Sequence, residues 1–292
     1  MAPRVARRSA KTVIEGYFDF DTAVGRGSGF ARLLYNEAAP GSTQAWIVLT
    51  TLQEIRGAEE TVGARRPTGL EYSLAFAGDN WLDKRRKATA YEDHDPEVLI
   101  VGAGQSGLAL AARLKQFVVD PLLIEMNPRV GDNWRNRYHS LTLHNEVWTN
   151  SLPYLPFPPT WPTYVPKDKL AGWLEAYAEF MELNVWTSTR FLGGEYDEKS
   201  QSWSVRLNSG GKERSLRVRH LVLATGAVSG QPLMPRLSGL DTFGGEVMHS
   251  SQFTTGVKYR GKRALVVGTG NSGHDVAQDL YENGAAQVTI VQ

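Results

Sequence analysis

The amino-acid sequence predicts an α/β protein, and three observations point to that class. Two apolar, β-branched runs, at residues 98–101 and 264–267, are each followed by a turn of the form G-x-G-x-x-G and then by a helical pattern. Between them, residues 185–224 form short runs of β character separated by polar, glycine-containing turns. Together these patterns indicate buried parallel strands joined by helices, with an antiparallel insertion.

The composition is that of a globular chain, and it limits the classes of function. The 292 residues are 41% hydrophobic and 22% charged, which suits about two domains with real cores. A net charge of +1 gives no global field for nucleic acid or an anionic membrane, so we expect neither partner. The absence of cysteine excludes disulfides, thiolate metal sites and cysteine nucleophiles. No apolar run is long enough to span a membrane, and we expect a soluble, cytoplasmic protein with no metal site.

Residues 1–93 are expected to form a separate accessory region. The basic start, MAPRVARRSAKT, suits either an organellar transit peptide or a frayed, solvated tail. Residues 46–52, WIVLTTL, have the character of a strand. By contrast, GARRPTG at 63–69 and LDKRRK at 82–87 are typical of loop and linker.

The first fingerprint lies just after Pro96, in the sequence VLIVGAGQSG at residues 98–107. In such a turn Gly102 permits the tight bend, Gly104 lets the backbone approach a pyrophosphate, and Gly107 allows close packing of helix on strand. The helix that follows presents its free N–H groups to the phosphates. This spacing predicts a dinucleotide site, with a glycine turn in an unrelated α/β core as the alternative.

An acidic residue supports the dinucleotide reading. Glu125 ends the second apolar run and follows Gly102 by 23 positions (125 − 102), near the spacing of about 20 for the acid that hydrogen-bonds a ribose hydroxyl.

After it, residues 126–166 are rich in aromatic side chains and carry six prolines between 151 and 166, which exclude helix and central strand there. We expect an ordered loop that either lines a site or clamps the structure. Residues 167–181 then have the pattern of an amphipathic helix.

The middle of the chain turns to β structure. The alternation around residues 203–207 predicts a small antiparallel meander inserted into the nucleotide-binding unit. LVLATG at 221–226 has the pattern of a buried strand ending in glycine, and SGQPLMPRLSG at 229–239 marks a passage out of this unit. We therefore predict one domain over residues 94–235 and the beginning of another over 236–292.

The second fingerprint, ALVVGTGNSG at residues 264–273, is followed by a helical segment at 274–282 and a strand at 287–291. The residue that separates NAD from NADP would lie just past that strand, so this stretch leaves the choice open. Two units of this kind indicate a flavin held by the first and a nicotinamide by the second, with hydride passing between them. Flavin disulfide reductases share the plan, but they need a redox-active cysteine pair and are excluded.

Between the two fingerprints, the sequence resembles a known family. FGGEVMHSSQF at 243–253 resembles the FxGxxxHxxx(Y/F) signature of flavin-containing monooxygenases. GDNWR (131–135), YHSLTLH (138–144), LPFP (155–158), PKDKL (166–170) and ATG (224–226) are also similar, particularly to the fungal and YUCCA-like branches. The resemblance runs from about Pro96 to Gln292, and the region before it is similar to the accessory segment of fungal members. It implies a three-layer, Rossmann-like FAD-binding domain with an inserted meander, followed by the start of a second Rossmann-like, NAD(P)-binding domain.

The resemblance also implies a reaction. In this family NADPH reduces FAD, the reduced flavin captures O2 as a hydroperoxide, and one oxygen atom passes to nitrogen, sulfur or a carbonyl carbon of a small substrate. The protein then needs only to hold flavin and nicotinamide together and to exclude water. A catalytic triad or carboxylate pair is therefore not expected. The substrate itself is not predicted, and a homo-oligomer is left open.

The site residues that the resemblance implies fall into four groups. FAD would be bound by Gly102, Gly104, Gln105, Ser106, Gly107, Glu125, Thr225 and Gly226. Trp134, Arg135 and His144 would lie along the flavin. The NADP pyrophosphate would be held by Gly268, Gly270, Asn271, Ser272 and Gly273. His249, which taken alone suits a surface loop, becomes the candidate catalytic residue in this spacing, and with Phe253 it would shape the domain junction.

Some features depart from the family pattern. Phe253 stands where Baeyer–Villiger members have tryptophan, which favours heteroatom or YUCCA-type oxygenation over Baeyer–Villiger chemistry. Gly131-Asp-Asn-Trp134 replaces the common GGxW. Family members also continue well beyond their second fingerprint. Two hypotheses follow: a truncated monooxygenase, or a non-catalytic nucleotide-binding remnant.

Overall fold

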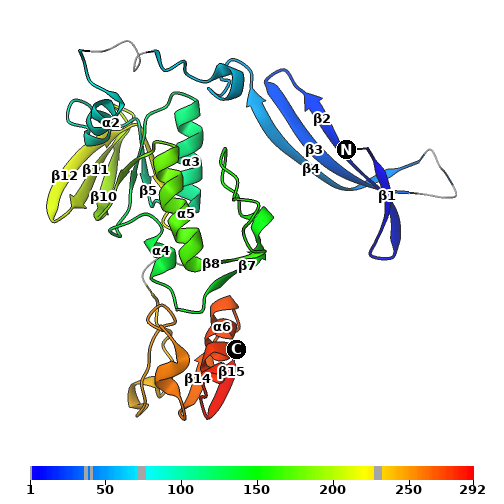
Figure 1. Cartoon of the computed structure of the whole chain (residues 1–292), viewed down its shortest axis with the longest axis vertical. Coiled ribbons are helices and arrows are strands. Elements are labelled where there is room, and N and C mark those ends of the chain that lie inside the picture. The colour runs from blue at the N-terminus through cyan, green and yellow to red at the C-terminus, as the bar shows by residue number, and fades with distance from the viewer. Residues whose placement is uncertain (1, 36–38, 40–41, 71–76, 227–231) are drawn as a thin grey trace. The chain divides into compact units, whose positions relative to one another are not determined.

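The computed structural model describes residues 2–35, 39, 42–70, 77–226 and 232–292 (Figure 1). The chain separates into two compact units, Met1–Thr68 and Gly69–Gln292. The predicted boundaries at residues 93 and 235 are not tested by this division and stay predictions. Within the described residues, no helix combines the length and the apolar character needed to cross a membrane.

The first unit is built on a four-stranded antiparallel sheet in the order β1-β2-β3-β4. Its strands are β1 Arg4–Arg8, β2 Lys11–Asp21, β3 Gly25–Leu34 and β4 Gln44–Ile55, followed by a short 3₁₀ turn, η1 Gly63–Arg65. The strand expected at residues 46–52 is confirmed as part of β4.

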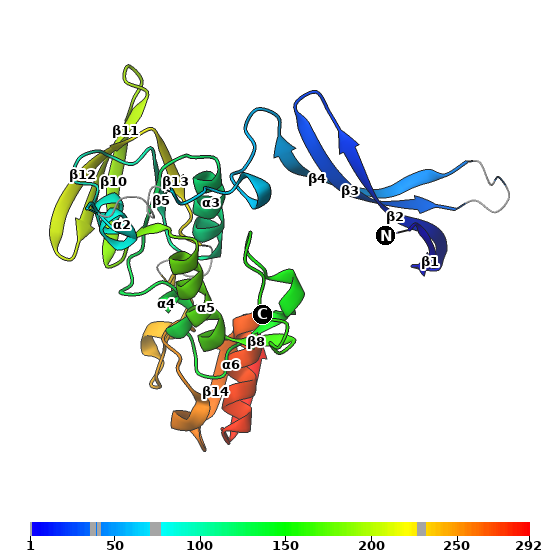
Figure 2. The ribbon, with the colours of Figure 1, turned by 45° about the horizontal axis from the view of Figure 1, so that its top comes forward.

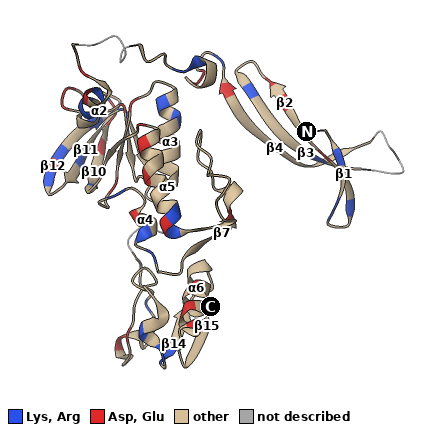
Figure 3. Ribbon diagram, viewed as in Figure 1, with Lys and Arg blue, Asp and Glu red and all other residues tan. Residues whose placement is uncertain are grey.

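The expectation of a frayed N-terminal tail is wrong, because the basic segment is strand β1, paired along its length with β2 (Figure 3). The cause is a buried acid, Glu15, which is 3% exposed and accepts hydrogen bonds from Arg4, Arg8 and Arg32. These guanidinium groups, the Arg8 hydrogen bond first among them, lower the pKa of Glu15 to about 2. Three cations on one carboxylate thus hold the start of the chain in the sheet.

The second unit has three layers around a parallel sheet in the order β13-β5-β6-β9 (Figures 1 and 2). Alternate residues of β5 and β6 face opposite layers. Ile100 and Leu123 pack against the helices on one side, and Leu99 and Leu122 pack against a β-meander on the other. The strands are β5 Val98–Val101, β6 Pro121–Ile124, β9 Asn184–Trp186 and β13 His220–Leu223, the helices α3 Gln105–Gln116 and α5 Lys167–Phe180, and the meander β10 Thr189–Asp197, β11 Ser202–Ser209 and β12 Lys212–Val218.

A helix, α2 Trp81–Ala90, occupies the segment expected to be a linker at residues 82–87, so that prediction is wrong. The helix begins with a capping box, in which Asn80 accepts from the Asp83 N–H and the Asp83 carboxylate accepts from the Asn80 N–H. Its last turn is held by β9 and β12, since the Trp186 indole N–H donates to the Thr89 carbonyl and Arg214 donates to the Ala90 carbonyl. Distant contacts, rather than an apolar face, fix this charged helix.

The aromatic segment, residues 126–166, is ordered but not free of regular structure. It contains a one-turn helix, α4 Asp132–Arg135, a 3₁₀ turn, η2 Val147–Thr149, and a ribbon of β7 Thr142–Glu146 with β8 Tyr164–Pro166. The expectation that helix is excluded needs this correction, since Pro128 precedes α4 and the other six prolines of the segment lie after residue 151, which leaves α4 free to form. Gly131 precedes α4 at φ +90°, and a Cβ there would lie 2.4 Å from the Ala171 carbonyl oxygen of α5.

The second fingerprint forms the predicted strand, turn, helix and strand. Strand β14 Arg263–Val267 pairs in parallel with β15 Gln287–Val291, and α6 Asn271–Glu282 connects them. The helix buries Val276, Ala277 and Leu280. Short 3₁₀ turns, η3 Leu240–Thr242 and η4 Gly256–Tyr259, lead into this unit. Part of the passage expected at 229–239 lies outside the described residues.

Candidate functional site

A cavity of about 970 Å³ lies at the carboxyl ends of β5, β6 and β13, where open α/β sheets bind their ligands. Val101 and Ile124, the last residues of β5 and β6, both line it. The cavity brings together most of the residues expected at the cofactor site: Gly102, Gly104, Gln105, Ser106, Glu125, Trp134, His144, Thr225, Gly226, Gly270, Asn271 and Ser272. Both glycine turns therefore open onto one space.

The first glycine turn packs tightly against backbone carbonyl groups at Gly102 and Gly107, but it leaves space on the side of the cavity at Gly104. Gly102 has φ +107°, and a Cβ there would lie 2.5 Å from the Ala224 carbonyl oxygen. A Cβ on Gly107 would lie 2.0 Å from the Gly102 carbonyl oxygen, so neither position admits a side chain without rearrangement. Gly104, the N-cap of α3, differs: the nearest atom to a Cβ there is the Asn133 side-chain nitrogen at 3.7 Å. The space in front of Gly104 is free for a ligand.

Glu125 is buried at the end of β6 and is held by local N–H groups. Its Oε2 accepts from the Ala103 backbone at 3.2 Å, while Oε1 accepts from the Asn127 backbone at 2.9 Å and from the Asn127 side chain at 2.8 Å. A carboxylate has about four acceptor positions, so capacity remains for hydroxyl groups in the cavity. The acid thus has a fixed orientation beside the first glycine turn.

The two residues of the Trp134-Arg135 pair diverge. The Trp134 indole N–H donates to Gln105 Oε1 at 3.3 Å, at the start of α3. Arg135 does not line the cavity. Its guanidinium donates to the Val130 carbonyl and to Asp132 Oδ1, both at 2.8 Å, and to Glu175 Oε2 of α5, also at 2.8 Å. Arg135 therefore anchors the α4 turn onto α5.

The second glycine turn repeats the geometry of the first. Gly268 has φ +111°, and a Cβ on Gly273 would lie 2.2 Å from the Gly268 carbonyl oxygen. Each turn also donates from its first glycine to the end of the neighbouring strand, Gly102 to Ile124 and Gly268 to Val291, both at 2.8 Å. Gly270 is the N-cap of α6, with open space where a Cβ would stand. Gly107, Gly268 and Gly273 shape their turns without lining the cavity.

Two side chains that the sequence reasoning missed, Arg137 and Tyr138, connect the loop after α4 to α6, together with the expected His144. Arg137 Nη2 donates to Ser272 Oγ at 3.2 Å. The Tyr138 hydroxyl donates to Asp275 Oδ2, and His144 Nε2 lies 3.0 Å from the same oxygen. Burial, with the neighbouring Asp275 carboxylate, raises the pKa of Tyr138 to about 12. The pattern W-R-N-R-Y offers two arginines, and only the second faces the cavity.

An apolar cluster reinforces this junction. Its buried members come from the loop, from the segment before η4 and from α6: Tyr138, Leu141, Phe253, Val276 and Leu280. The Phe253 ring also stacks on Tyr259, with centroids 6.1 Å apart. His249, four residues earlier, lies outside the cavity, and its Nδ1 accepts from the Ser251 N–H at 3.1 Å. The expected junction segment thus packs Phe253 against α6, whereas the His249 side chain bonds to its own local turn.

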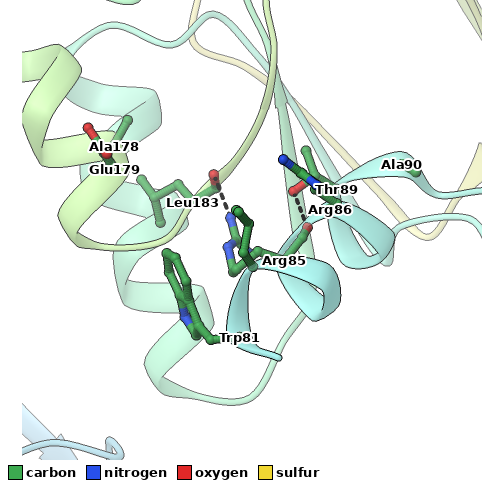
Figure 4. A pocket seen from close by; sticks show the side chains of 9 residues that line it. Trp81, Arg85, Arg86, Thr89, Ala90, Ala178, Glu179 and Leu183 are labelled. Atoms are coloured by element: carbon green, nitrogen blue, oxygen red, sulfur yellow. Dashed lines mark hydrogen bonds between the residues drawn. The ribbon is translucent and has the colours of Figure 1, made fainter. Parts of the chain in front are cut away.

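A second, smaller cavity of about 460 Å³ lies between α2 and the end of α5 (Figure 4). Its polar groups hold α2 in place. The Trp81 indole N–H donates to Glu182 Oε1 at 2.7 Å, and Arg85 donates to Asn184 Oδ1 at 2.8 Å and to the Leu183 carbonyl at 3.3 Å. The described residues that line this cavity include no glycine turn, so the larger one is the candidate site.

Comparisons with known proteins agree with the geometry. A family model described as flavin-binding monooxygenase-like matches residues 95–292. Indole-3-pyruvate monooxygenase YUCCA1 from Oryza sativa subsp. japonica is 36% identical over 212 residues, which cover 72% of this chain and 51% of that protein. Probable indole-3-pyruvate monooxygenase YUCCA3 from Arabidopsis thaliana is 38% identical over 200 residues, covering 66% and 46% respectively. The chain thus spans about half the length of these curated relatives.

Solved structures support the fold. A flavin-containing monooxygenase from Stenotrophomonas maltophilia superposes with a TM-score of 0.61 at 24% identity, covering 68% of this chain and 57% of that one. The crystal structure of OTEMO in complex with FAD and NADP gives a TM-score of 0.55 at 26% identity, covering 68% and 39%. The predicted class, a Rossmann-like α/β unit with an inserted meander and a second fingerprint, is confirmed.

Proposed function

Because the chain belongs to the flavin-binding monooxygenase-like family, we propose that it binds FAD at the first fingerprint and NADP at the second. With these cofactors it would contribute to the insertion of one oxygen atom from O2 into a small organic substrate. The reaction classes that the resemblance favours are oxygenation of nitrogen or sulfur and YUCCA-type oxygenation of a carbonyl compound. The observation that carries the proposal is the single cavity onto which both glycine turns open.

The residues of the first turn fit FAD. The N-terminus of α3 and the open space at Gly104 suit a pyrophosphate, which needs N–H donors and no Cβ in its path. Glu125, fixed by Ala103 and Asn127, keeps acceptor capacity for a ribose diol. FAD, when bound, supplies the redox and oxygen chemistry, and the chain holds and orients it.

The second turn fits a nicotinamide dinucleotide for the same reasons, with Gly270 and the N-terminus of α6 facing the cavity. NADP rather than NAD is proposed from the family resemblance and from the cofactor pair in the OTEMO complex. Trp134, Tyr138 and Leu141 line the space between the two turns. Their role would be to exclude water from the reacting groups. His249 lies outside the cavity, so we propose for it a part in shaping the junction segment.

A second candidate function is FAD binding without NADPH turnover. It is favoured by the exposure of β14, the strand before the second fingerprint turn, where Leu265 is 62% and Val267 is 54% exposed. A strand this open gives the second turn less support than the buried β5 gives the first. The two candidates make the same prediction for FAD and opposite predictions for its reduction.

Purified chain tests both candidates. We expect it to carry or take up FAD, seen as a flavin absorption spectrum, and to be reduced by NADPH in an anaerobic stopped-flow experiment. Flavin uptake without reduction would support the second candidate. The variant Gly104→Ala keeps room for its Cβ in the fold but places it toward the proposed pyrophosphate, and it should lose FAD. Gly172→Ala is the matched control, because it adds a Cβ in open space on α5. A chain that binds no FAD under any condition would contradict the proposal.

A further inference from the structure

The guanidinium of Arg137 lies between the two glycine turns, and we propose that it is the phosphate-binding side chain of the second site. It would take an oxygen of the pyrophosphate of the nicotinamide dinucleotide. This inference rests on the proposed function, because it assigns a recognition residue to that same site. The loop after α4, rather than α6 itself, would then supply the cation for the second fingerprint.

Few charged side chains line the cavity, and this makes Arg137 a candidate ligand for an anion. Among the described residues that line it, the only arginines or lysines are Arg137 and Arg190, and Glu125 is the only acid. Arg190 lies on β10 and Glu125 directly follows β6, so both lie in the part of the chain that carries the first fingerprint. The turn from Gly268 to Gly273 brings no charged side chain of its own to the cavity. Of the two arginines among the described lining residues, Arg137 is the one that contacts this end of α6, through Ser272.

The bonding of Arg137 leaves donors available. Its Nη2 donates to Ser272 Oγ in the first turn of α6. Its Nε has no hydrogen-bond partner among the described residues, but that atom is buried and does not face the cavity. Arginine has five N–H donors, and the residue lines the cavity with its Nη2 already at Ser272. A phosphate at the N-terminus of α6 would accept from the Nη donors beside Ser272.

Asp275, the acid in the first turns of α6, is paired with side chains other than Arg137. Asp275, one turn further along α6, accepts from the Tyr138 hydroxyl and lies 3.0 Å from His144 Nε2. These contacts satisfy its Oδ2 and hold α6 against the loop that carries Arg137. The position of Arg137 is therefore set by its neighbour Tyr138, which is 2% exposed.

The first fingerprint shows the same loop acting in a different way. Trp134, three positions before Arg137, donates its indole N–H to Gln105 at the start of α3. The corresponding position at the start of α6 is Asn271, and the residue after it, Ser272, receives Arg137. One short segment thus contacts both helix N-termini, with a neutral donor at the first and a cation at the second.

Titration of the FAD-loaded chain with NADP⁺ tests the assignment, using calorimetry for NADP⁺ and flavin fluorescence for FAD. We expect Arg137→Gln to weaken NADP⁺ binding about 10- to 100-fold, the effect of losing a charge-assisted hydrogen bond, and to leave FAD affinity within about twofold. Arg137→Lys should recover part of the loss, because it restores the charge without the planar fork. Arg206→Gln is the control, since it removes an arginine from an exposed position of β11 outside the cavity.

Two outcomes would overturn the proposal: unchanged NADP⁺ affinity in Arg137→Gln, or a loss of FAD affinity as large as the loss of NADP⁺ affinity. If Arg137→Gln does not fold, the same comparison is made with Arg137→Lys against the wild type. Inorganic pyrophosphate serves as a second probe. If the wild type binds no NADP⁺, the proposed function fails. Pyrophosphate still decides the role of Arg137, which is rejected if the wild type and Arg137→Gln bind it equally.

Discussion

The two fingerprint units have nearly the same turn and very different surroundings. In both, a Cβ on the third glycine would lie about as close to the carbonyl of the first, 2.0 Å for Gly107 and 2.2 Å for Gly273. Yet β5 and β6 are buried along their whole length, whereas β14 and β15 have no fully buried residue. Turn geometry is therefore a local property of the sequence, and burial is a property of the layers that cover it.

The covering layers explain the difference. The sheet that carries the first fingerprint has α3 and α5 on one face and the meander on the other. Among the described residues around the second fingerprint, α6 and the junction cluster cover one face of β14 and β15, which leaves Leu265 and Val267 exposed on the other. Apolar burial contributes about 25 cal/mol per Å², so the two units should differ strongly in how much each strand stabilises the fold.

The largest expected effect tests this difference directly with one substitution made in each unit. Leu123→Ala, at a fully buried position of β6, should lower the free energy of unfolding by about 2–5 kcal/mol. Leu265→Ala, at a 62% exposed position of β14, should change it by less than about 0.5 kcal/mol. Guanidinium unfolding followed by tryptophan fluorescence measures both, since Trp173 packs in the same cluster as Leu123. Equal losses would mean that the exposed strand is covered in solution.

The next prediction concerns what the units share. Gly107→Ala and Gly273→Ala each drive a Cβ into a backbone carbonyl, and each should cost about 1–3 kcal/mol locally. Hydrogen exchange at the amides of α3 and α6 would report the two losses separately. We expect Gly107→Ala to act on α3 and Gly273→Ala on α6, with similar magnitudes. If Gly273→Ala had no effect on α6, the second turn would be more pliant than its geometry indicates.

Sequence reasoning succeeded where the contacts are local and failed where they are distant. The turns were predictable because Gly102 and Gly107, or Gly268 and Gly273, meet within five positions. Helix α2 was missed because its contacts come from Asn184 and Arg214, about a hundred or more positions away. Arg137 and Tyr138 reach α6 across 135 and 137 positions, which no spacing rule connects. The capping residues Asn80 and Asp83 are visible in the sequence, and their spacing would have predicted the start of α2.

The smallest expected effect concerns the contact between the loop after α4 and α6, the Tyr138–Asp275 hydrogen bond. The pKa of Tyr138 is raised to about 12 in the folded chain, above the ordinary value of 10.0. The neutral phenol is thus favoured by folding, so its contribution is fully present below pH 10 and is lost as the pH rises toward 12. Tyr91 and Tyr177, with raised pKa values of their own, add to any alkaline loss of stability. The share of Tyr138 in the alkaline loss of stability is therefore measured by comparing variants with the wild type.

Tyr138→Phe keeps the ring in the junction cluster and removes the titrating hydroxyl. Relative to the wild type, it should lose about 1 kcal/mol of stability near neutral pH and show a shallower decline between pH 10 and 12. Asp275→Asn should lower the pKa of Tyr138 only part of the way, because burial is the larger cause of its rise. Ultraviolet titration of tyrosine and thermal unfolding across this pH range measure both effects. If the alkaline decline were the same in Tyr138→Phe and the wild type, this hydrogen bond would not hold α6 to the loop after α4, and the apolar cluster around Phe253 would be the contact that remains.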